Sequence, residues 1–339
     1  MAGTRLRLAT FNLENLDEGG RGAPPLEARL AVLRPQLQRL DADILCLQEV
    51  HGQKPAGGAS RGLLALERLV EGTAYAGFHR ASTSSTGRHA GGAWVADIHN
   101  LVVLSRFPVA CSEEVRERLV EPPSYRLTTA NPPEQAARPC SFERPLLHVR
   151  VRLPCGRLLH LVNLHLRAPL ASVVPGQKES AFCWRSVPGW AEGFFVSTVK
   201  RAAQALEARL LVDTILDAEP AALIAVVGDC NAEDRTMPLR LLAAETADTG
   251  NGALAARSLV PLERSLPADR RWTVIHHGRR VMLDHILVTR TLLGAFRTLE
   301  IHSETLGDEL EPAQGLASPT ESYHAPMVAS FAFAGSGSR

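Results

Sequence analysis

Polar side chains interrupt the apolar segments of this chain at the points where predicted strands end. Asn12 closes the first of these segments, and Glu49 closes the second. Asp229 and Asn231 follow an apolar run that ends at residue 227. Burying a charged group costs several kcal/mol unless it is paired or bound to a metal ion. The pattern therefore suggests that these strand ends meet at a binding or catalytic site.

Two histidines and a further aspartate have the same kind of placement. His165 alternates with apolar residues in segment 158–166, where it shares a side with Asn163. Side chains two residues apart in a strand lie on one face, so both are predicted to point to the interior. Asp284 is surrounded by apolar residues, and His324 immediately precedes the last predicted strand.

Each of these residues also has an ordinary structural interpretation. An asparagine at a strand end is often a turn former, and a glycine followed by Asp229 is a common turn after a strand. Asp284 alone is consistent with a core carboxylate paired to Arg280, and His165 with a hydrogen-bonded core histidine. The combination of carboxylates, amides and histidines is what favours one shared site.

The chemistry of these side chains suits a hard cation beside an anion. Glu49 and Asp229 offer oxygen ligands, which favour Mg²⁺ or Mn²⁺. The six cysteines are dispersed without a C-x-x-C pair, and no H-E-x-x-H helix is present, which argues against a zinc hydrolase. A hard cation next to histidines and amides suits a phosphate ester, because the metal neutralises charge during displacement.

The strands and helices that would position these residues alternate along the chain. Apolar patterning predicts strands at 5–13, 43–49, 101–104, 146–153, 158–166, 224–227, 281–288 and 327–333. Helices are predicted at 26–40, which Pro35 interrupts, and at 63–70 and 196–216. We expect the irregular segments 79–99, 120–145 and 167–195 to be binding loops.

The composition is that of an ordinary globular protein. Of 339 residues, 45% are hydrophobic and 22% charged, which excludes collagen-like and intrinsically disordered chains. The net charge of +1 argues against a general nucleic-acid coat, although a local basic patch is compatible with it. No segment reaches the roughly 18 residues that cross a membrane, and we find no signal peptide pattern. We expect one domain over 1–334, a polar tail at 335–339, free thiols and a cytoplasmic location.

Taken in chain order, the motifs resemble those of the endonuclease/exonuclease/phosphatase superfamily. The resemblance rests on TFN at 10–12, LQEV at 47–50, LSRFP at 104–108, NLHL at 163–166, GDCN at 228–231, LDHI at 283–286 and SYHAP at 322–326. No single motif is specific, but all of them in this order are. The resemblance implies an α/β (α+β) fold, a DNase I-like four-layer α/β/β/α sandwich of two packed mixed β-sheets.

The resemblance also implies a role for each matched residue. Glu49 would bind Mg²⁺ or Mn²⁺, with Asn12 and Asp229 beside it. Asp229 would orient or deprotonate the attacking water, and His324, held by Asp284, would act as a base or as an electrostatic stabiliser. The residues expected to contact the phosphate or assist the leaving group are His165, Asn231, Asn12, Asn163, Arg106 and Arg144.

The implied activity is metal-dependent hydrolysis of a phosphodiester by in-line attack of water, with DNA and RNA as candidate partners and no membrane anchor. A phosphomonoesterase or lipid-headgroup hydrolase, similar to sphingomyelinases or inositol phosphatases, remains open. Tyr323 stands where the superfamily usually has Asp, which leaves open a catalytically impaired binding protein and puts a second metal in doubt. Trp184 and Trp190 could stack on a base or anchor their loop to the core.

Overall fold

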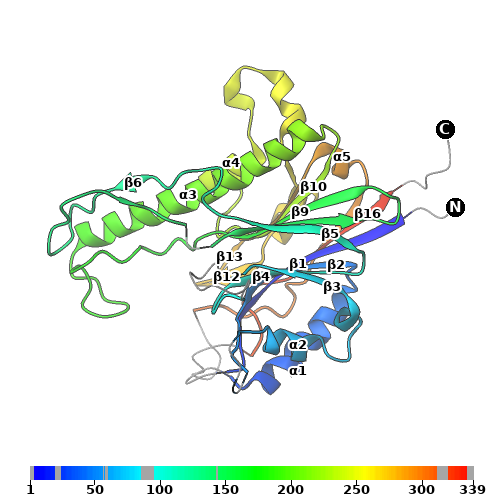
Figure 1. The fold of residues 1–339 in the computed structure, drawn as a ribbon, viewed down its shortest axis with the longest axis horizontal. Coiled ribbons are helices and arrows are strands. Elements are labelled where there is room, and N and C mark those ends of the chain that lie inside the picture. The colour runs from blue at the N-terminus through cyan, green and yellow to red at the C-terminus, as the bar shows by residue number, and fades with distance from the viewer. Residues whose placement is uncertain are drawn as a thin grey trace.

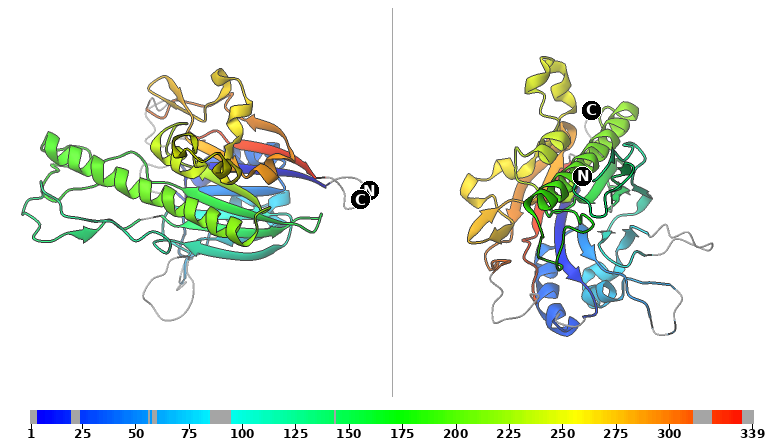
Figure 2. Two further views of the ribbon diagram at one scale, coloured as in Figure 1. Left: turned by 90° about the horizontal axis from the view of Figure 1, so that it is seen from above. Right: turned by 90° about the vertical axis from the view of Figure 1, so that its left-hand side faces the viewer.

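Two six-stranded sheets face each other in the computed structural model, and helices cover their outer faces (Figure 1, Figure 2). The structure describes residues 4–19, 24–55, 57, 60–84, 95–142, 144–310 and 320–333. The predicted tail 335–339 and part of the predicted loop 79–99 lie outside these residues.

The first sheet has a parallel pair of strands at its centre. Its strand order is β15-β16-β1-β2-β4-β3. In that order the strands are Phe296–Ile301, Met327–Phe333, Thr4–Leu16, Ile44–Val50, Asn100–Ser105 and His79–Ser82. β1 and β2 are parallel and the other neighbours are antiparallel. The carboxyl ends of the two central strands therefore meet at one edge of the sheet.

The second sheet repeats this arrangement. Its strand order is β11-β14-β10-β9-β8-β5. The strands are Val260–Pro261, Asp284–Val288, Leu223–Asp229, Leu158–His165, Leu146–Arg152 and Val109–Val115. Only β9 and β10 are parallel among these described strands, and they again occupy the centre.

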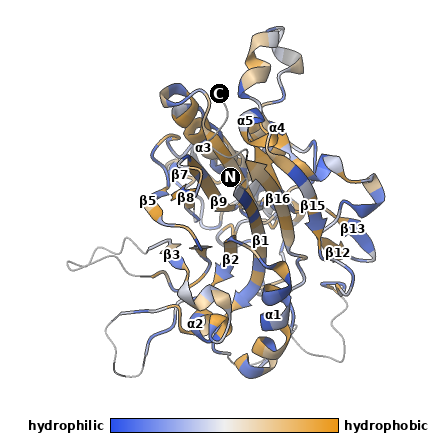
Figure 3. Ribbon diagram, turned by 90° about the vertical axis from the view of Figure 1, so that its right-hand side faces the viewer, coloured by the Kyte–Doolittle hydropathy of each residue, from blue (hydrophilic) through white to orange (hydrophobic). Residues whose placement is uncertain are grey.

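Three hydrophobic cores lie between the layers. The central core lies between the sheets and includes Leu8 and Ile44 from the first sheet and Leu161 and Val227 from the second. A second core joins the first sheet to α1 (Leu26–Leu40) and α2 (Leu64–Val70). A third joins the second sheet to α3 (Val187–Ala218) and α4 (Met237–Ala243). Figure 3 shows hydrophobic residues concentrated on the strands between the helices. The predicted four-layer sandwich is confirmed.

Short elements complete the fold. They are α5 (Arg290–Leu293), β6 (Ser124–Tyr125), β7 (Arg138–Pro139), β12 (Val274–His276), β13 (Arg279–Val281) and 3₁₀ turns at Ala74–Gly77, Ala247–Thr249, Gly252–Arg257, Leu262–Ser265 and Ala268–Arg270. None of the described helices is both long enough and apolar enough to cross a membrane. All six cysteines are free, as predicted.

Three of the predicted elements differ in the structure, and β3, β5, β15 and α4 were not predicted. Pro35 lies inside α1 without ending it, because the buried leucine face of this helix outweighs one lost hydrogen bond. The predicted strand 281–288 is divided between β13 and β14. α3 begins at Val187, inside a predicted loop, because Ser186 caps it and Pro188 suits the first helical turn.

The first turns of α3 extend beyond the second sheet. Residues 187–200 project past the strand ends together with the connecting segment 167–186 (Figure 1, Figure 2). Glu192 of α3 accepts hydrogen bonds from Tyr125, Thr128 and Thr129, which attach the segment around β6 to the helix. Burial opposes ionisation of Glu192, but these donors lower its pKa to about 2. We call residues 167–200 the overhang.

A buried histidine pair lies on strands β8 and β9, away from the strand ends discussed below. The rings of His148 and His160 stack with centroids 5.2 Å apart, and Nε2 of His148 is 3.0 Å from Nδ1 of His160. Nδ1 of His148 is 2.9 Å from Oε1 of Glu113. Burial lowers the pKa of both histidines, that of His160 to about 4.

This pair predicts a loss of stability in mild acid. An unfolded histidine has a pKa of about 6.5, so unfolding takes up protons below that pH while the folded His160 stays neutral down to about pH 4. The free energy of unfolding should therefore fall between about pH 6.5 and pH 4, by up to about 1.4 kcal/mol per pH unit for His160. Urea unfolding of His160→Asn should show a flatter pH dependence. The exposed His79→Asn serves as control, and an unchanged slope in His160→Asn would contradict the assignment.

Candidate active site

The register of the two parallel pairs brings four predicted residues to the same edge of the sandwich. Asn12 lies opposite Gln48 in the β1–β2 pair, which places Glu49 at the next position along β2. Asp229 lies opposite His165 in the β9–β10 pair. All four predicted side chains converge between the sheets, because each parallel pair ends at this edge.

The two carboxylates share the same nitrogen neighbours. Nδ2 of Asn12 donates to Oε1 of Glu49 at 3.2 Å and to Oδ2 of Asp229 at 3.1 Å. Nε2 of His165 lies 3.4 Å and 3.3 Å from the same two oxygens. The carboxylate oxygens therefore face a common point, and the Asp229 residue is only 1% exposed.

The turn after β10 fixes the carboxylate of Asp229. The main-chain N–H of Asn231 donates to Oδ1 of Asp229 at 2.7 Å, and its side-chain Nδ2 donates to Oδ2 at 3.1 Å and to the Leu166 carbonyl at 3.0 Å. Gly228 has φ +131°, and a Cβ atom there would lie 2.0 Å from the Leu164 carbonyl oxygen. Only glycine therefore permits the close approach of β9 that this turn requires.

The predicted pairing of His324 with Asp284 is present. Nδ1 of His324 lies 2.8 Å from Oδ2 of Asp284, and its Nε2 lies 4.0 Å from Oδ2 of Asp229. Ser322 accepts a hydrogen bond from the His324 N–H at 3.0 Å and donates to the Asn12 carbonyl at 2.7 Å. A carboxylate on Nδ1 fixes the orientation of the ring, so Nε2 faces the carboxylate cluster.

Backbone strain is concentrated in this cluster. Glu49, His99 and Asn231 have φ values of 58°, 58° and 47°, in the left-handed region. Asparagine and histidine are enriched in this conformation relative to other residues, whereas glutamate adopts it rarely, at a cost of roughly 1–3 kcal/mol. The surrounding fold must impose these conformations, which are typical of functional sites.

The charges of the cluster stabilise one another. Burial alone would raise the pKa values of Glu49 and Asp229, but neighbouring histidines hold both below their ordinary values. Burial alone would lower the pKa of His324, but Asp284 and Asp229 raise it well above its ordinary value. The cluster therefore favours ionised carboxylates beside positive charge, which is the electrostatic environment that a cation would join.

His99 belongs to the cluster although the sequence analysis did not assign it. Its ring stacks between His51 and His165, with centroid distances of 5.5 Å and 5.7 Å. Burial, with the charge of Arg144, lowers its pKa to about 4. His99 precedes β4 in a segment without strand alternation, so no sequence pattern indicated it.

Glu14 is the second residue that the sequence analysis missed. Burial raises the pKa of its carboxyl group to about 7, with opposing effects from the nearby charges of His324 and Glu49. Its main-chain N–H donates to Oδ1 of Asn12 at 2.9 Å. Its position two residues after Asn12 was the available signal, but the predicted strand ended at residue 13.

The donor set is compatible with a divalent cation. Two groups of potential ligand atoms each lie within 4.8 Å of one another: Glu49, His99 and His165, and Asp229, Asp284 and His324. Nδ1 of His165 and Oδ1 of Asp284 are buried without a hydrogen-bond partner in the described structure. Buried polar atoms without partners are uncommon, so these atoms and the converging carboxylate oxygens are consistent with a bound ion.

Arg106, a predicted phosphate-binding residue, lies outside the cluster. β4 is antiparallel to β2, and Ser105 pairs with Ile44 at the opposite end of β2 from Glu49. Ile44 and Glu49 are five residues apart along β2, which corresponds to about 17 Å. The Arg106 guanidinium instead forms an ion pair with Asp43 at 2.8 Å. The LSRFP motif therefore fixes the start of β2, and this part of the predicted site is corrected.

Asn163 is also removed from the predicted substrate-binding set. It is fully buried, and its Nδ2 donates to the carbonyls of Leu47 and Val102 at 3.1 Å each. Its Oδ1 accepts from Nε2 of Gln48 at 2.7 Å. Asn163 thus joins the two sheets behind the cluster, and strand parity predicted its inward direction without distinguishing a structural role from a catalytic one.

Three further predictions depend on local orientation. Asn12 points its Nδ2, rather than its oxygen, at the carboxylates, so it holds them as a donor in this structure. Arg144 donates from Nη1 to the Leu166 carbonyl at 3.0 Å, and its charge acts on Glu49. Tyr323 is half-buried, and burial together with the Glu14 charge raises its pKa.

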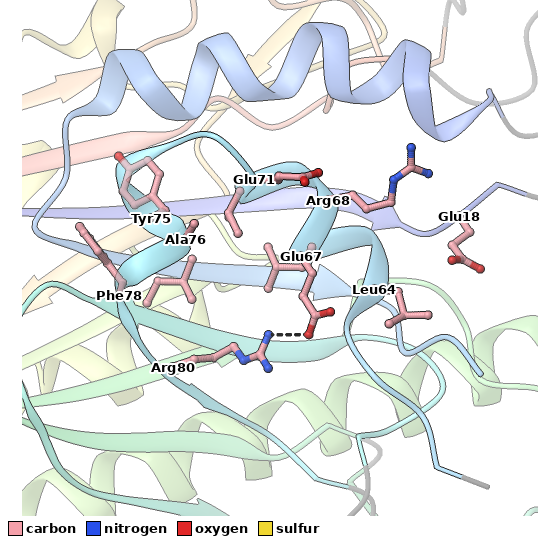
Figure 4. A pocket seen from close by; sticks show the side chains of 12 residues that line it. Glu18, Leu64, Glu67, Arg68, Glu71, Tyr75, Ala76, Phe78 and Arg80 are labelled. Carbon is pink, nitrogen blue, oxygen red and sulfur yellow. Dashed lines mark hydrogen bonds and ion pairs between the residues drawn. The ribbon is translucent and has the colours of Figure 1, made fainter. Parts of the chain in front are cut away.

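A cavity of about 810 Å³ lies elsewhere, on α2 and the adjoining strands (Figure 4). Its charged lining residues include Glu67 and Arg80, which form an ion pair at 3.2 Å. None of the clustered residues lines it. This cavity is therefore separate from the candidate active site.

Comparisons with solved structures find similar folds. An endonuclease/exonuclease/phosphatase from Beutenbergia cavernae DSM 12333 matches with 18% identity and a TM-score of 0.52, covering 98% of this chain and 72% of that chain. Truncated TDP2 from Caenorhabditis elegans matches with 16% identity and a TM-score of 0.55, covering 97% and 98%. An AP endonuclease from Archaeoglobus fulgidus matches with 14% identity and a TM-score of 0.51, covering 96% and 98%.

At these identities the structural likeness shows the fold alone. No match was found among curated protein sequences. The sequence matches the Endonuclease/Exonuclease/phosphatase family over residues 9–305. The chain therefore belongs to this family.

Proposed function

We propose that this protein is a divalent-metal-dependent phosphodiesterase that hydrolyses its substrate by in-line attack of water. Members of its family are generally hydrolases of phosphate esters. The observation that carries the proposal is the convergence of Glu49 and Asp229 on a common point beside His165 and the His324–Asp284 pair. One of the similar structures is an AP endonuclease, which makes a nucleic acid a reasonable class of substrate.

Glu49 and Asp229 are the residues that would hold Mg²⁺ or Mn²⁺. When bound, the ion supplies charge neutralisation at the phosphoryl and leaving-group oxygens. Asn12 keeps the two carboxylates together through its hydrogen bonds to both. Asp284 and His324 form a separate pair, so the carboxylate of Asp284 is already used to orient a ring.

Water activation is assigned to Asp229. Its Oδ2 accepts from Nδ2 of Asn12 and lies 3.3 Å from Nε2 of His165, and the ionised carboxylate can orient a water molecule and accept its proton. His324 presents Nε2 towards this oxygen and would stabilise charge on the phosphoryl group. Nε2 of His165 lies within 3.4 Å of an oxygen of each carboxylate, where it can donate to a phosphoryl or leaving-group oxygen.

Asn231 and Arg144 complete the proposed phosphate contacts. Both donate to the Leu166 carbonyl, so this carbonyl holds them side by side at the edge of the cluster. By exchanging a bond to this carbonyl, each side chain would donate to a non-bridging oxygen of a phosphodiester. A catalytically impaired protein is suggested only by Tyr323, whereas the intact His324–Asp284 pair favours activity.

A substrate panel tests the reaction class. With Mg²⁺ or Mn²⁺, we expect turnover of bis(p-nitrophenyl) phosphate and of DNA, and little turnover of p-nitrophenyl phosphate. Preference for the monoester would instead identify a phosphomonoesterase or headgroup hydrolase. No turnover of any of these substrates, together with no metal binding, would identify a binding protein without catalytic activity.

The orienting role of Asp284 predicts a defect in turnover rather than in metal binding. Asp284→Asn should lower kcat for bis(p-nitrophenyl) phosphate about 10²- to 10⁴-fold, because the His324 ring loses its carboxylate partner. Calorimetric affinity for Mn²⁺ should change much less than kcat. Near-normal kcat in a folded variant would refute the role of this pair.

The metal assignment is tested by binding rather than activity. Glu49→Gln removes one charged ligand while preserving shape, and we expect at least a tenfold loss of Mn²⁺ affinity in calorimetry. Glu67→Gln, which alters a carboxylate in the separate cavity, is the matched control and should bind like the parent protein. Equal affinity of the Glu49 and Glu67 variants would exclude Glu49 as a ligand.

A further inference from the structure

The overhang carries an apolar helix face that no layer of the sandwich covers. In the C-terminal half of α3, Ala205, Ala208 and Val212 pack into the core against the second sheet. Counting back in steps of three and four residues, the same face carries Arg201, then Phe194 and Trp190, and ends near Val187. The core-facing side of the helix therefore continues past the point where the sheet ends (Figure 1).

These overhang residues are exposed although they are large and apolar. Val187 is 77% exposed, Trp190 45% and Phe194 38%. The rings of Trp190 and Phe194 stack on each other, with centroids 5.6 Å apart and planes at 24°. Exposed apolar surface of this kind marks an interaction site more often than chance placement does.

The overhang is held firmly in place. Its connecting segment contacts the helix through the Ser172 N–H, which donates to the Gly193 carbonyl at 2.8 Å. Nε of Arg167 donates to Oγ of Ser197 at 3.1 Å. The same connecting segment carries Leu170, which is 72% exposed. A segment that is already held in place loses less conformational entropy when a partner binds, so the exposed rings are suited to recognition.

The exposed face begins at the candidate active site. Nη1 of Arg201 donates to the main-chain carbonyl of Asn231, in the turn that fixes Asp229. From Arg201 to Val187 the helix rises about 21 Å away from this turn. An extended substrate with its reacting group at Asp229 would therefore meet Arg201 first and the aromatic pair further out.

The charge of the overhang favours an anionic occupant. The overhang and the adjoining Arg201 contain five lysines and arginines against two glutamates, in a chain whose net charge is only +1. One of the glutamates, Glu192, is already surrounded by donors from the β6 segment. Lys178 lies over the Trp184 ring at 5.0 Å, so this tryptophan anchors a loop while Trp190 remains available.

We propose that the overhang binds unpaired nucleobases of a single-stranded nucleic acid, whose reacting phosphodiester lies at Asp229. The proposal rests on the proposed function and extends it to a class of substrate. Bases stack on exposed aromatic rings regardless of sequence, and neighbouring cations meet the phosphates. A duplex hides the base faces, so a single strand is the form that the aromatic pair recognises.

Binding of a short thymidine oligonucleotide, labelled with fluorescein and measured by anisotropy in EDTA, tests this without turnover. We expect Trp190→Ala and Phe194→Ala each to weaken binding roughly fivefold to 100-fold. Leu254→Ala, at a comparably exposed apolar residue outside the overhang, should bind like the parent protein. The parent protein should bind the single strand more tightly than the matching duplex.

Three results would overturn the proposal. They are no binding of the oligonucleotide, undiminished binding by both aromatic variants, and co-sedimentation with phosphatidylcholine–phosphatidylglycerol vesicles that depends on Trp190 and Phe194. The last result would make the face a lipid-docking surface. Turnover separates this inference from the proposed function: failure of the parent protein to cleave bis(p-nitrophenyl) phosphate counts against the reaction. A fall in the ratio of oligonucleotide to small-diester kcat/KM in Trp190→Ala supports the overhang.

Discussion

The hydrogen bond from Asn12 to Asp229 is the contact on which the candidate site depends. It joins the central parallel pair of one sheet to that of the other, over 3.1 Å, at a carboxylate that is almost completely buried. A hydrogen bond to a charged group contributes about 1.5–3 kcal/mol, and an unpaired buried carboxylate would cost more than that. Behind it, Gln48 and Asn163 join the sheets a second time. The two sheets therefore cannot slide without breaking both polar bridges.

Strand periodicity predicted most of the convergent residues, whereas the four layers were predicted from the resemblance to the superfamily. Asn12, Glu49, His165, Asp229 and Asp284 interrupt apolar strands, and only a shared polar environment accommodates them. Periodicity gives the direction of a side chain but not its partner. For that reason Asn163 was predicted to meet substrate although it bonds to main-chain carbonyls of the opposite sheet.

The remaining differences arise from long-range geometry. Arg106 belongs to a motif shared with the family, yet the antiparallel direction of β4 carries it to the far end of the sheet. His99 and Glu14 reach the cluster through left-handed backbone conformations, which residue preferences would not predict. The start of α3 was obscured by proline and glycine, although both suit the first turn of a capped helix.

The matching strand orders of the two sheets have a consequence for how mutations act. Each sheet places one parallel pair at its centre, flanked by two antiparallel strands on either side, so the two sheets share one topology. Glu49 comes from one half and His165 from the other. The distance between them is thus set by the packing of the two sheets across the central core, together with the polar bridges of Asn12 and Asn163. Substitutions deep in that core, far from any polar group, can retune the chemistry by shifting one half of the molecule against the other.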